Sequence, residues 1–274
     1  MLTLPEGCCS LPLRNQTGWL EAVKILVVAN QKGGVGKTSL VLHLTWVLSE
    51  IGRRVLVIDL DPQGNLSWCL KRLSDETLCP AAAVFEKEEV HAERIAENIW
   101  LTASNIKLAR YEAMAGGVNI YFRLRRALQK FLKEHPLDHV IIDCPPSLGL
   151  FSLSALVAGE SLIIPMRTEV FSVAGLGDLL NIVDEVRENI NPNLSIAGLV
   201  LNAVSARTKV AQNTLNELSE ITEELGLPIL SVIPATVKME EALREGLPVW
   251  QLKPQTPLAK KIKSEFQQLI EKLR

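Results

Sequence analysis

The chain has 274 residues, which suits one or two domains and allows a core large enough to fold without disulfides or metals. Its 29 Lys and Arg against 31 Asp and Glu give a net charge of −2, which excludes a protein that holds nucleic acid by bulk charge alone. Five cysteines with no Cys-x-x-Cys pair exclude a zinc ribbon and indicate reduced thiols in a cytoplasmic protein. We expect residues 1–20, which lack the features of a signal peptide, to form an N-terminal extension, and residues 21–274 to form one domain.

Short apolar runs and longer helical stretches alternate along this domain. The runs are rich in Val, Ile and Leu with little polar alternation, which is typical of strands covered on both faces. Helical periodicity separates them, as in residues 39–50 and 173–189. This order predicts an α/β fold, a doubly wound, mostly parallel sheet with helices on both faces. The expected strands are residues 25–29, 55–58, 99–103, 140–142, 161–165, 196–201 and 229–233.

A glycine-rich loop follows the first expected strand and leads directly into a helix. Glycines allow a loop to turn its N–H groups inward, and the helix adds its positive N-terminus, so the loop is suited to binding phosphates. Lys37 is expected to reach the β- and γ-phosphates, and the Thr38 hydroxyl to bind magnesium. The predicted nucleotide-binding residues of this loop are Gly33, Gly34, Val35, Gly36, Lys37, Thr38 and Ser39.

A second lysine makes the loop unusual. Gln31 stands where a P-loop has its first glycine, and Lys32 precedes the glycine pair. Since Lys37 already serves the bound nucleotide, Lys32 is expected to reach another anion, such as the nucleotide of a second subunit. The alternative is a solvated charge on the loop.

Three aspartates end two of the expected strands. Asp59 and Asp61 stand two residues apart before Pro62, and Asp143 precedes Cys144-Pro145-Pro146. The carboxyl ends of parallel strands meet at one edge of a sheet, where ligands bind. Carboxylates there are suited to holding magnesium and orienting an attacking water. The alternative for the first pair is a turn with a capping Asp.

Three motifs, KGGVGKT, DLDPQGN and DCPP, resemble in this order those of the ParA/MinD group of deviant Walker A P-loop ATPases. The resemblance covers residues 24 to about 270 and is closest to the ParA type. It implies the P-loop NTPase fold, ATP and Mg²⁺ as cofactors, and slow ATP hydrolysis. It further implies an ATP-dependent homodimer in which Lys32 touches the partner's phosphates.

Roles for four other residues also follow from the resemblance. Asp61 is tied to the hydrolytic water, and Asp59 holds a magnesium-bound water near Thr38 and Asp143. Asn202, at the end of a strand, hydrogen-bonds the adenine edge, and the backbone at Pro234 helps to enclose the ring.

A ParA-type ATPase positions or segregates cargo, which can be a plasmid, a chromosome or a protein organelle such as a carboxysome. The resemblance implies an ATP-bound dimer that associates with the nucleoid through nonspecific DNA binding, and a ParB-like or cargo adaptor that stimulates hydrolysis. Ala235 stands where the family often has an arginine. The predicted DNA contacts are Arg207, Lys209, Lys238, Arg244, Lys253 and Lys260.

Two alternative functions come from the C-terminal stripe and from the cysteines. Leu258, Ile262, Phe266 and Leu269 have helical spacing among basic residues, as in a MinD-like tail that lies on a membrane. We favour a terminal helix packed on the sheet and expect no membrane partner. An iron–sulfur protein of the same group needs paired cysteines at its dimer axis, which Cys144 alone does not provide.

Overall fold

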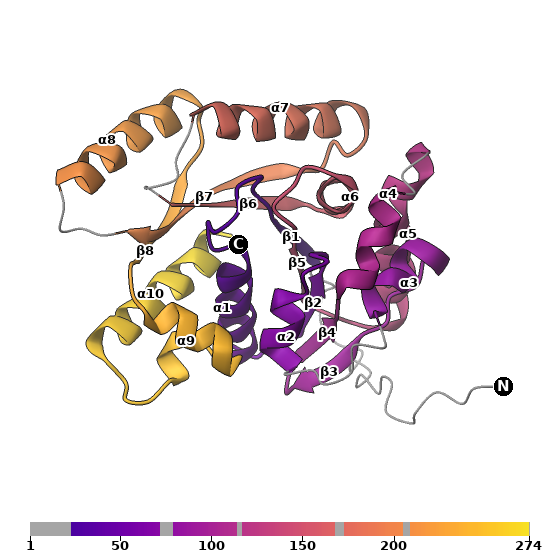
Figure 1. Cartoon of the computed structure of the whole chain (residues 1–274), viewed down its shortest axis with the longest axis horizontal. Coiled ribbons are helices and arrows are strands. Elements are labelled where there is room, and N and C mark those ends of the chain that lie inside the picture. The colour runs from indigo at the N-terminus through magenta and orange to yellow at the C-terminus, as the bar shows by residue number, and fades with distance from the viewer. Residues whose placement is uncertain (1–22, 72–78, 114–116, 168–172, 205–208, 274) are drawn as a thin grey trace, which may run out of the picture.

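The computed structural model describes residues 23–71, 79–113, 117–167, 173–204 and 209–273 (Figure 1). Its centre is an eight-stranded sheet in the order β3-β4-β2-β5-β1-β6-β7-β8, in which only β3 is antiparallel to its neighbour. This confirms the predicted doubly wound, mostly parallel sheet. The strands are β1 (Lys24–Val28), β2 (Val55–Asp59), β3 (Glu93–Ala96), β4 (Ile99–Thr102), β5 (His139–Asp143), β6 (Ser161–Arg167), β7 (Ser195–Val204) and β8 (Ile229–Pro234).

Helices cover both faces of the sheet. Successive residues of a strand point to opposite faces. Leu26 and Val28 therefore share one core with α1 and α10, whereas Val27 packs in a second core with α5, α6 and α7. Figure 1 shows α10 and α1 on one side of the strands and α7 on the other. The helices are α1 (Lys37–Glu50), α2 (Asn65–Lys71), α3 (Pro80–Lys87), α4 (Arg110–Ala113), α5 (Arg123–Glu134), α6 (Leu150–Ala158), α7 (Val173–Asn189), α8 (Lys209–Glu224), α9 (Lys238–Glu245) and α10 (Pro257–Lys272), with 3₁₀ turns η1 (Ile106–Ala109), η2 (Val118–Phe122) and η4 (Val249–Gln251).

All seven expected strands form, with ends shifted by up to three residues, and the sequence does not predict β3. Strand β3 has four residues at the edge of the sheet, and its Glu93 and Arg94 are exposed. It therefore lacks the apolar run that marks the buried strands. The predicted boundary at residue 20 lies outside the described residues, so the division into extension and domain stays a prediction.

The C-terminal segment is bound to helix α1. Trp46 donates a hydrogen bond to the Gly246 carbonyl (3.0 Å), and Glu50 accepts one from Trp250 Nε1 (2.8 Å) and pairs with Lys263 (2.7 Å). The apolar stripe of α10 is buried, which confirms the predicted packed terminal helix. Within the described residues, no helix has the length and apolarity needed to cross a bilayer.

A fully buried histidine joins the same elements. His43 Nδ1 lies 2.7 Å from the Ser39 carbonyl, and the Val249 N–H donates to His43 Nε2 (3.2 Å). Its ring stacks on Phe266 with centroids 5.0 Å apart. Because Nε2 accepts a hydrogen bond, Nδ1 holds the proton of a neutral imidazole. Burial lowers the pKa of His43 to about 4.

This histidine predicts a loss of stability in mild acid. Between the ordinary histidine pKa of 6.5 and about 4, the unfolded chain takes up a proton that the folded chain excludes, so the free energy of unfolding falls as the pH falls. We expect the parent to lose ~3 kcal/mol from this group between pH 7 and pH 4. In urea titrations at several pH values, His43→Gln should show a shallower pH dependence. The exposed His91→Gln serves as control, and equal slopes for His43→Gln and the parent would contradict the prediction.

Candidate functional site

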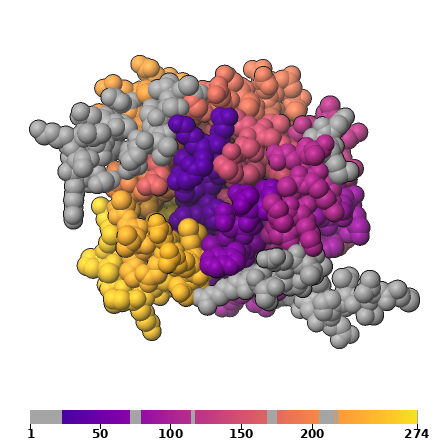
Figure 2. Space-filling model, in the orientation of Figure 1, coloured from indigo at the N-terminus to yellow at the C-terminus, as the bar shows by residue number. Residues whose placement is uncertain are grey.

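The phosphate loop connects the carboxyl end of β1 to the first residue of α1. Gly34 (φ +72°) and Gly36 (φ +91°) adopt left-handed backbone conformations that favour glycine. A Cβ on Gly36 would lie 2.7 Å from the side-chain nitrogen of Asn202. Gly33 and Gly34 are exposed, and Figure 2 shows the indigo segment that includes the loop at the surface, in the middle of one face. The loop is therefore both tightly turned and accessible to a ligand.

Lys37 lies inside this loop. Its Nζ donates hydrogen bonds to the carbonyls of Asn30 (3.1 Å) and Lys32 (3.0 Å). The side chain is buried, and burial lowers the pKa of Lys37 although the nearby Asp143 opposes the shift. Phosphate oxygens bound here would supply the negative charge that favours the ammonium form.

Asn30 fixes the turn that contains the second lysine. Its Oδ1 accepts a hydrogen bond from the Lys32 backbone N–H (2.9 Å), and its Nδ2 donates to the carbonyl of Pro165 in β6 (2.8 Å). Lys32 itself is half-buried and stands between the exposed Gln31 and Gly33. The sequence places Asn30 at a strand end but does not predict this role. The reach of Lys32 into a second subunit stays a prediction.

Asp143 and Thr38 form a pair of oxygen ligands suited to a divalent cation. The Thr38 hydroxyl donates to Asp143 Oδ2 (2.8 Å), while the buried Asp143 Oδ1 has no hydrogen-bond partner among the described residues. Burial raises the pKa of Asp143 well above its usual range, and the charge of Asp59 adds to the shift. Carboxylate and hydroxyl oxygens are hard ligands of the kind Mg²⁺ prefers. The residues present therefore fit the predicted metal.

Asp59 anchors the neighbouring acidic loop. Its Oδ1 accepts the Asp61 N–H (3.0 Å), and its Oδ2 accepts both the N–H (2.9 Å) and the hydroxyl (2.7 Å) of Ser67. Ser67 Oγ in turn accepts the Ser104 N–H (2.8 Å), and Asp61 Oδ1 accepts the Gln63 N–H (2.9 Å). Asp59 is fully buried, and burial raises its pKa to about 6. The structure thus gives Asp59 a role in holding the Asp61 loop, and its predicted role at a magnesium-bound water stays a prediction.

The remaining predicted nucleotide contacts differ in how close they come to the loop. Asn202 Nδ2 donates to the Val35 carbonyl (2.9 Å), so this residue reaches the loop from β7. The Ser39 hydroxyl donates to Met239 Sδ on α9 (3.6 Å). Pro234 is half-buried at the end of β8, opposite Val204. Contacts of Asn202 and Pro234 with adenine stay predictions.

The basic residues predicted to contact DNA are spread over the C-terminal part of the chain. Arg207 lies outside the described residues, as does the side chain of Lys209. Lys238 forms an ion pair with Glu241 in the first turn of α9. The other three are exposed: Arg244, Lys253 and Lys260.

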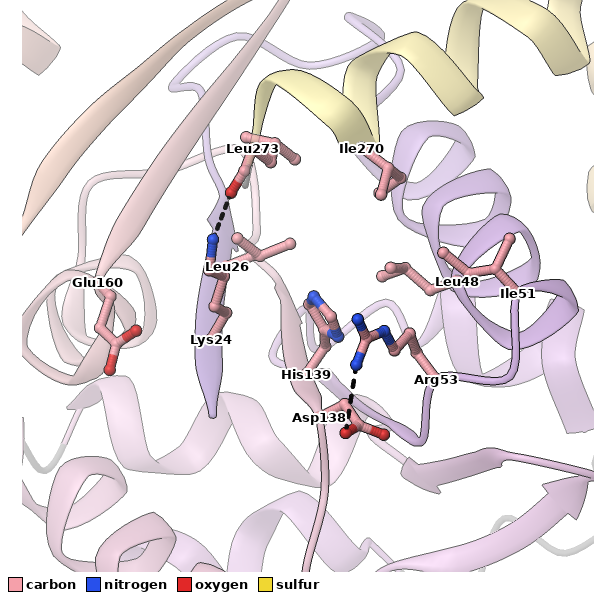
Figure 3. A pocket seen from close by; sticks show the side chains of 10 residues that line it. All are labelled: Lys24, Leu26, Leu48, Ile51, Arg53, Asp138, His139, Glu160, Ile270 and Leu273. Carbon is pink, nitrogen blue, oxygen red and sulfur yellow. Dashed lines mark hydrogen bonds and ion pairs between the residues drawn. The ribbon is translucent and has the colours of Figure 1, made fainter. Parts of the chain in front are cut away.

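A cavity of about 520 Å³ lies at the amino ends of the central strands (Figure 3). It is lined by Lys24 and His139, the first residues of β1 and β5, and by Leu48 of α1. Within it, Arg53 pairs with Asp138 at 3.9 Å. Ligands of parallel α/β sheets bind outside the carboxyl ends of the strands, so this cavity at the amino ends is separate from the phosphate loop.

Comparison with known proteins agrees with this geometry. The model of an AAA domain family matches residues 23–196. The chain is 35% identical over 231 residues to the sporulation initiation inhibitor protein Soj of Bacillus subtilis, covering 82% of this chain and 90% of that protein. It is 32% identical over 247 residues to the chromosome partitioning protein ParA of Myxococcus xanthus, covering 86% and 84%.

A solved structure adds a nucleotide to the comparison. The chain is similar to a crystal structure described as cobyrinic acid a,c-diamide synthase from Mycobacterium smegmatis with bound ADP and magnesium. The identity is 36%, the TM-score is 0.68, and the match covers 82% of this chain and 92% of that one. ATP and Mg²⁺ as cofactors are consistent with this similarity and with the fit of Thr38 and Asp143 to the metal.

Asp143→Asn tests the metal site. The amide retains the shape of the side chain but removes the charge that a divalent cation needs, so we expect Mg²⁺-dependent ATP binding to weaken by about 10–100-fold. Isothermal titration of ATP with Mg²⁺ and with EDTA measures this difference. Asp184→Asn, at an exposed position on α7, is the matched control. An unchanged Mg²⁺ dependence in Asp143→Asn would remove Asp143 from the site.

Proposed function

The chain belongs to the ParA group of AAA-domain P-loop ATPases, and on that premise we propose that it positions or segregates a cargo in an ATP-driven cycle. In this cycle ATP joins two protomers into a homodimer, and the dimer binds nucleoid DNA without sequence preference. A ParB-like or other adaptor on the cargo stimulates hydrolysis and release. The cargo classes open to such an ATPase are a plasmid, a chromosome and a protein organelle.

The observation that supports this proposal is the different placement of the two loop lysines. Lys37 is buried, with its Nζ within 3.1 Å of two loop carbonyls, where it serves the phosphates of its own subunit. Lys32 is only half-buried, and its neighbours Gln31 and Gly33 are exposed. A cation there is suited to an anion that approaches from outside, as the nucleotide of a second protomer would.

Hydrolysis in this site depends on orientation and charge. Magnesium, when bound, would neutralise charge that develops on the phosphates. The Asp61 N–H donates to Asp59, and the Asp61 carboxylate accepts the Gln63 N–H. A carboxylate fixed in this way supports the proposal that Asp61 orients the attacking water. A carboxylate is a weak general base, so we propose slow hydrolysis until a partner stimulates it.

Membrane association in the manner of MinD is the second candidate, and the packing of α10 disfavours it. The apolar residues that such a tail would insert are buried against α1 and β8: Ile262, Phe266, Leu269 and Ile270. Pelleting with anionic vesicles, with and without ATP, separates this candidate from DNA binding.

Lys32→Ala tests the homodimer. We expect the variant to bind ATP but to remain monomeric in light scattering under conditions in which ATP doubles the mass of the parent. The bond from the backbone N–H of residue 32 to Asn30 does not involve the side chain, so the variant can retain it. Lys87→Ala, at an exposed position on α3, is the control. ATP-dependent dimers of Lys32→Ala would refute the role of this lysine across the interface.

DNA binding is tested by gel shift with ADP, ATP and a slowly hydrolysed analogue at two salt concentrations. We expect retention only with ATP or the analogue, weakening as salt rises because phosphate contacts release counterions. Asp61→Ala should prolong the ATP-dependent retention, since it blocks hydrolysis while leaving the phosphate loop intact. Prompt release by this variant would count against the role of Asp61, and no retention under any condition would refute the DNA step.

A further inference from the structure

Two neighbouring strand ends donate hydrogen bonds to consecutive carbonyls of the phosphate loop. Arg167 Nη1, at the end of β6, lies 3.5 Å from the Gly34 carbonyl oxygen, and Asn202 Nδ2, on β7, lies 2.9 Å from that of Val35. Arg167 and Asn202 are directly opposite each other in the β6–β7 ladder. These two contacts, made by Arg167 and Asn202 from adjacent strands, hold neighbouring carbonyls of the loop, and we call them the clamp.

The strand that contains Arg167 is itself fixed to the start of the loop. Asn30 donates to the Pro165 carbonyl of β6 and accepts the Lys32 N–H. The loop is thus held at three successive points, the N–H of Lys32 and the carbonyls of Gly34 and Val35. Arg167 adds a third positive charge beside the loop, in addition to those of Lys32 and Lys37.

Each of the two clamped carbonyls belongs to a peptide unit that also contains the backbone N–H of the next residue. The Gly34 carbonyl shares a planar peptide unit with the Val35 N–H, and the Val35 carbonyl shares one with the Gly36 N–H. In a trans peptide the N–H points away from the carbonyl, so a donor that fixes the carbonyl also fixes the direction of the N–H. A charged donor polarises the unit as well, which strengthens the N–H as a donor.

We propose that Arg167 and Asn202 are positioning residues that direct the Val35 and Gly36 N–H groups at the phosphate shared by ATP and ADP. Backbone N–H groups of this loop surround the α- and β-phosphates, which both nucleotides possess. The clamp acts on these amides from the carbonyl side of the loop. It rests on the nucleotide binding within the proposed function and requires neither the homodimer nor DNA.

The test compares Arg167→Met and Arg167→Lys with the parent by titration of Mg-ADP and Mg-ATP and by steady-state hydrolysis. Arg167→Met removes the donors and the charge but keeps the length of the side chain. We expect it to weaken both nucleotides by about tenfold and to raise KM, with kcat at saturating ATP changed by less than about threefold, since a charge-assisted hydrogen bond orients the loop and not the water. Arg167→Lys retains the charge and should recover part of the affinity. Arg187→Met, at an exposed position on α7, is the control.

Two results would overturn the clamp. A loss confined to ATP or to kcat would make Arg167 a γ-phosphate or transition-state contact, and equal affinities in Arg167→Met and the parent would remove it from the site. A parent that binds neither nucleotide would refute the proposed function itself. Thermal unfolding without nucleotide separates a folding defect from a binding defect, because the clamp predicts parent-like melting together with weakened binding of both nucleotides.

Discussion

Burial of charge at one edge of the parallel sheet is the constraint on which the site depends. Lys37, Asp59 and Asp143 are all buried there, and desolvation shifts the pKa of each toward its neutral form. Buried charges are costly unless an opposite charge or hydrogen bonds compensate them. A phosphate group beside Lys37 and a magnesium ion beside Asp143 would supply that compensation together, which is a physical reason for this group of residues to bind nucleotide and metal as a pair.

Hydrogen bonds from within the chain compensate the remaining charge, that of Asp59. Asp59 accepts three hydrogen bonds, from Asp61 and Ser67, so its carboxylate holds the turn after β2. Through Ser67 the same group reaches the Ser104 N–H, just beyond the end of β4. The position of Asp61 is therefore set by a network that spans two neighbouring strand ends.

The motifs near the phosphate loop could be predicted because their residues lie close together in sequence. The glycine spacing, Lys37-Thr38 and the aspartates at strand ends each report on local structure, and the folded chain brings them to one edge of the sheet. The roles of Asn30, Arg167 and Ser67 could not be predicted. Arg167 meets Gly34 across 133 residues, and no local pattern indicates which strand-end side chain will touch which carbonyl. Strand β3 was missed for a related reason, since an exposed edge strand needs no continuous apolar run.

Helix α1 connects the phosphate loop to the C-terminal segment of the chain. It begins at Lys37 in the phosphate loop, and along its length His43, Trp46 and Glu50 are bonded to the segment that includes η4 and α10. These hydrogen bonds fix α1 to the C-terminal segment along much of its length. A ligand that tilted α1 at the loop would therefore have to move with it the residues bonded to the helix, from Gly246 to Lys263, which lie some two hundred residues later in the chain.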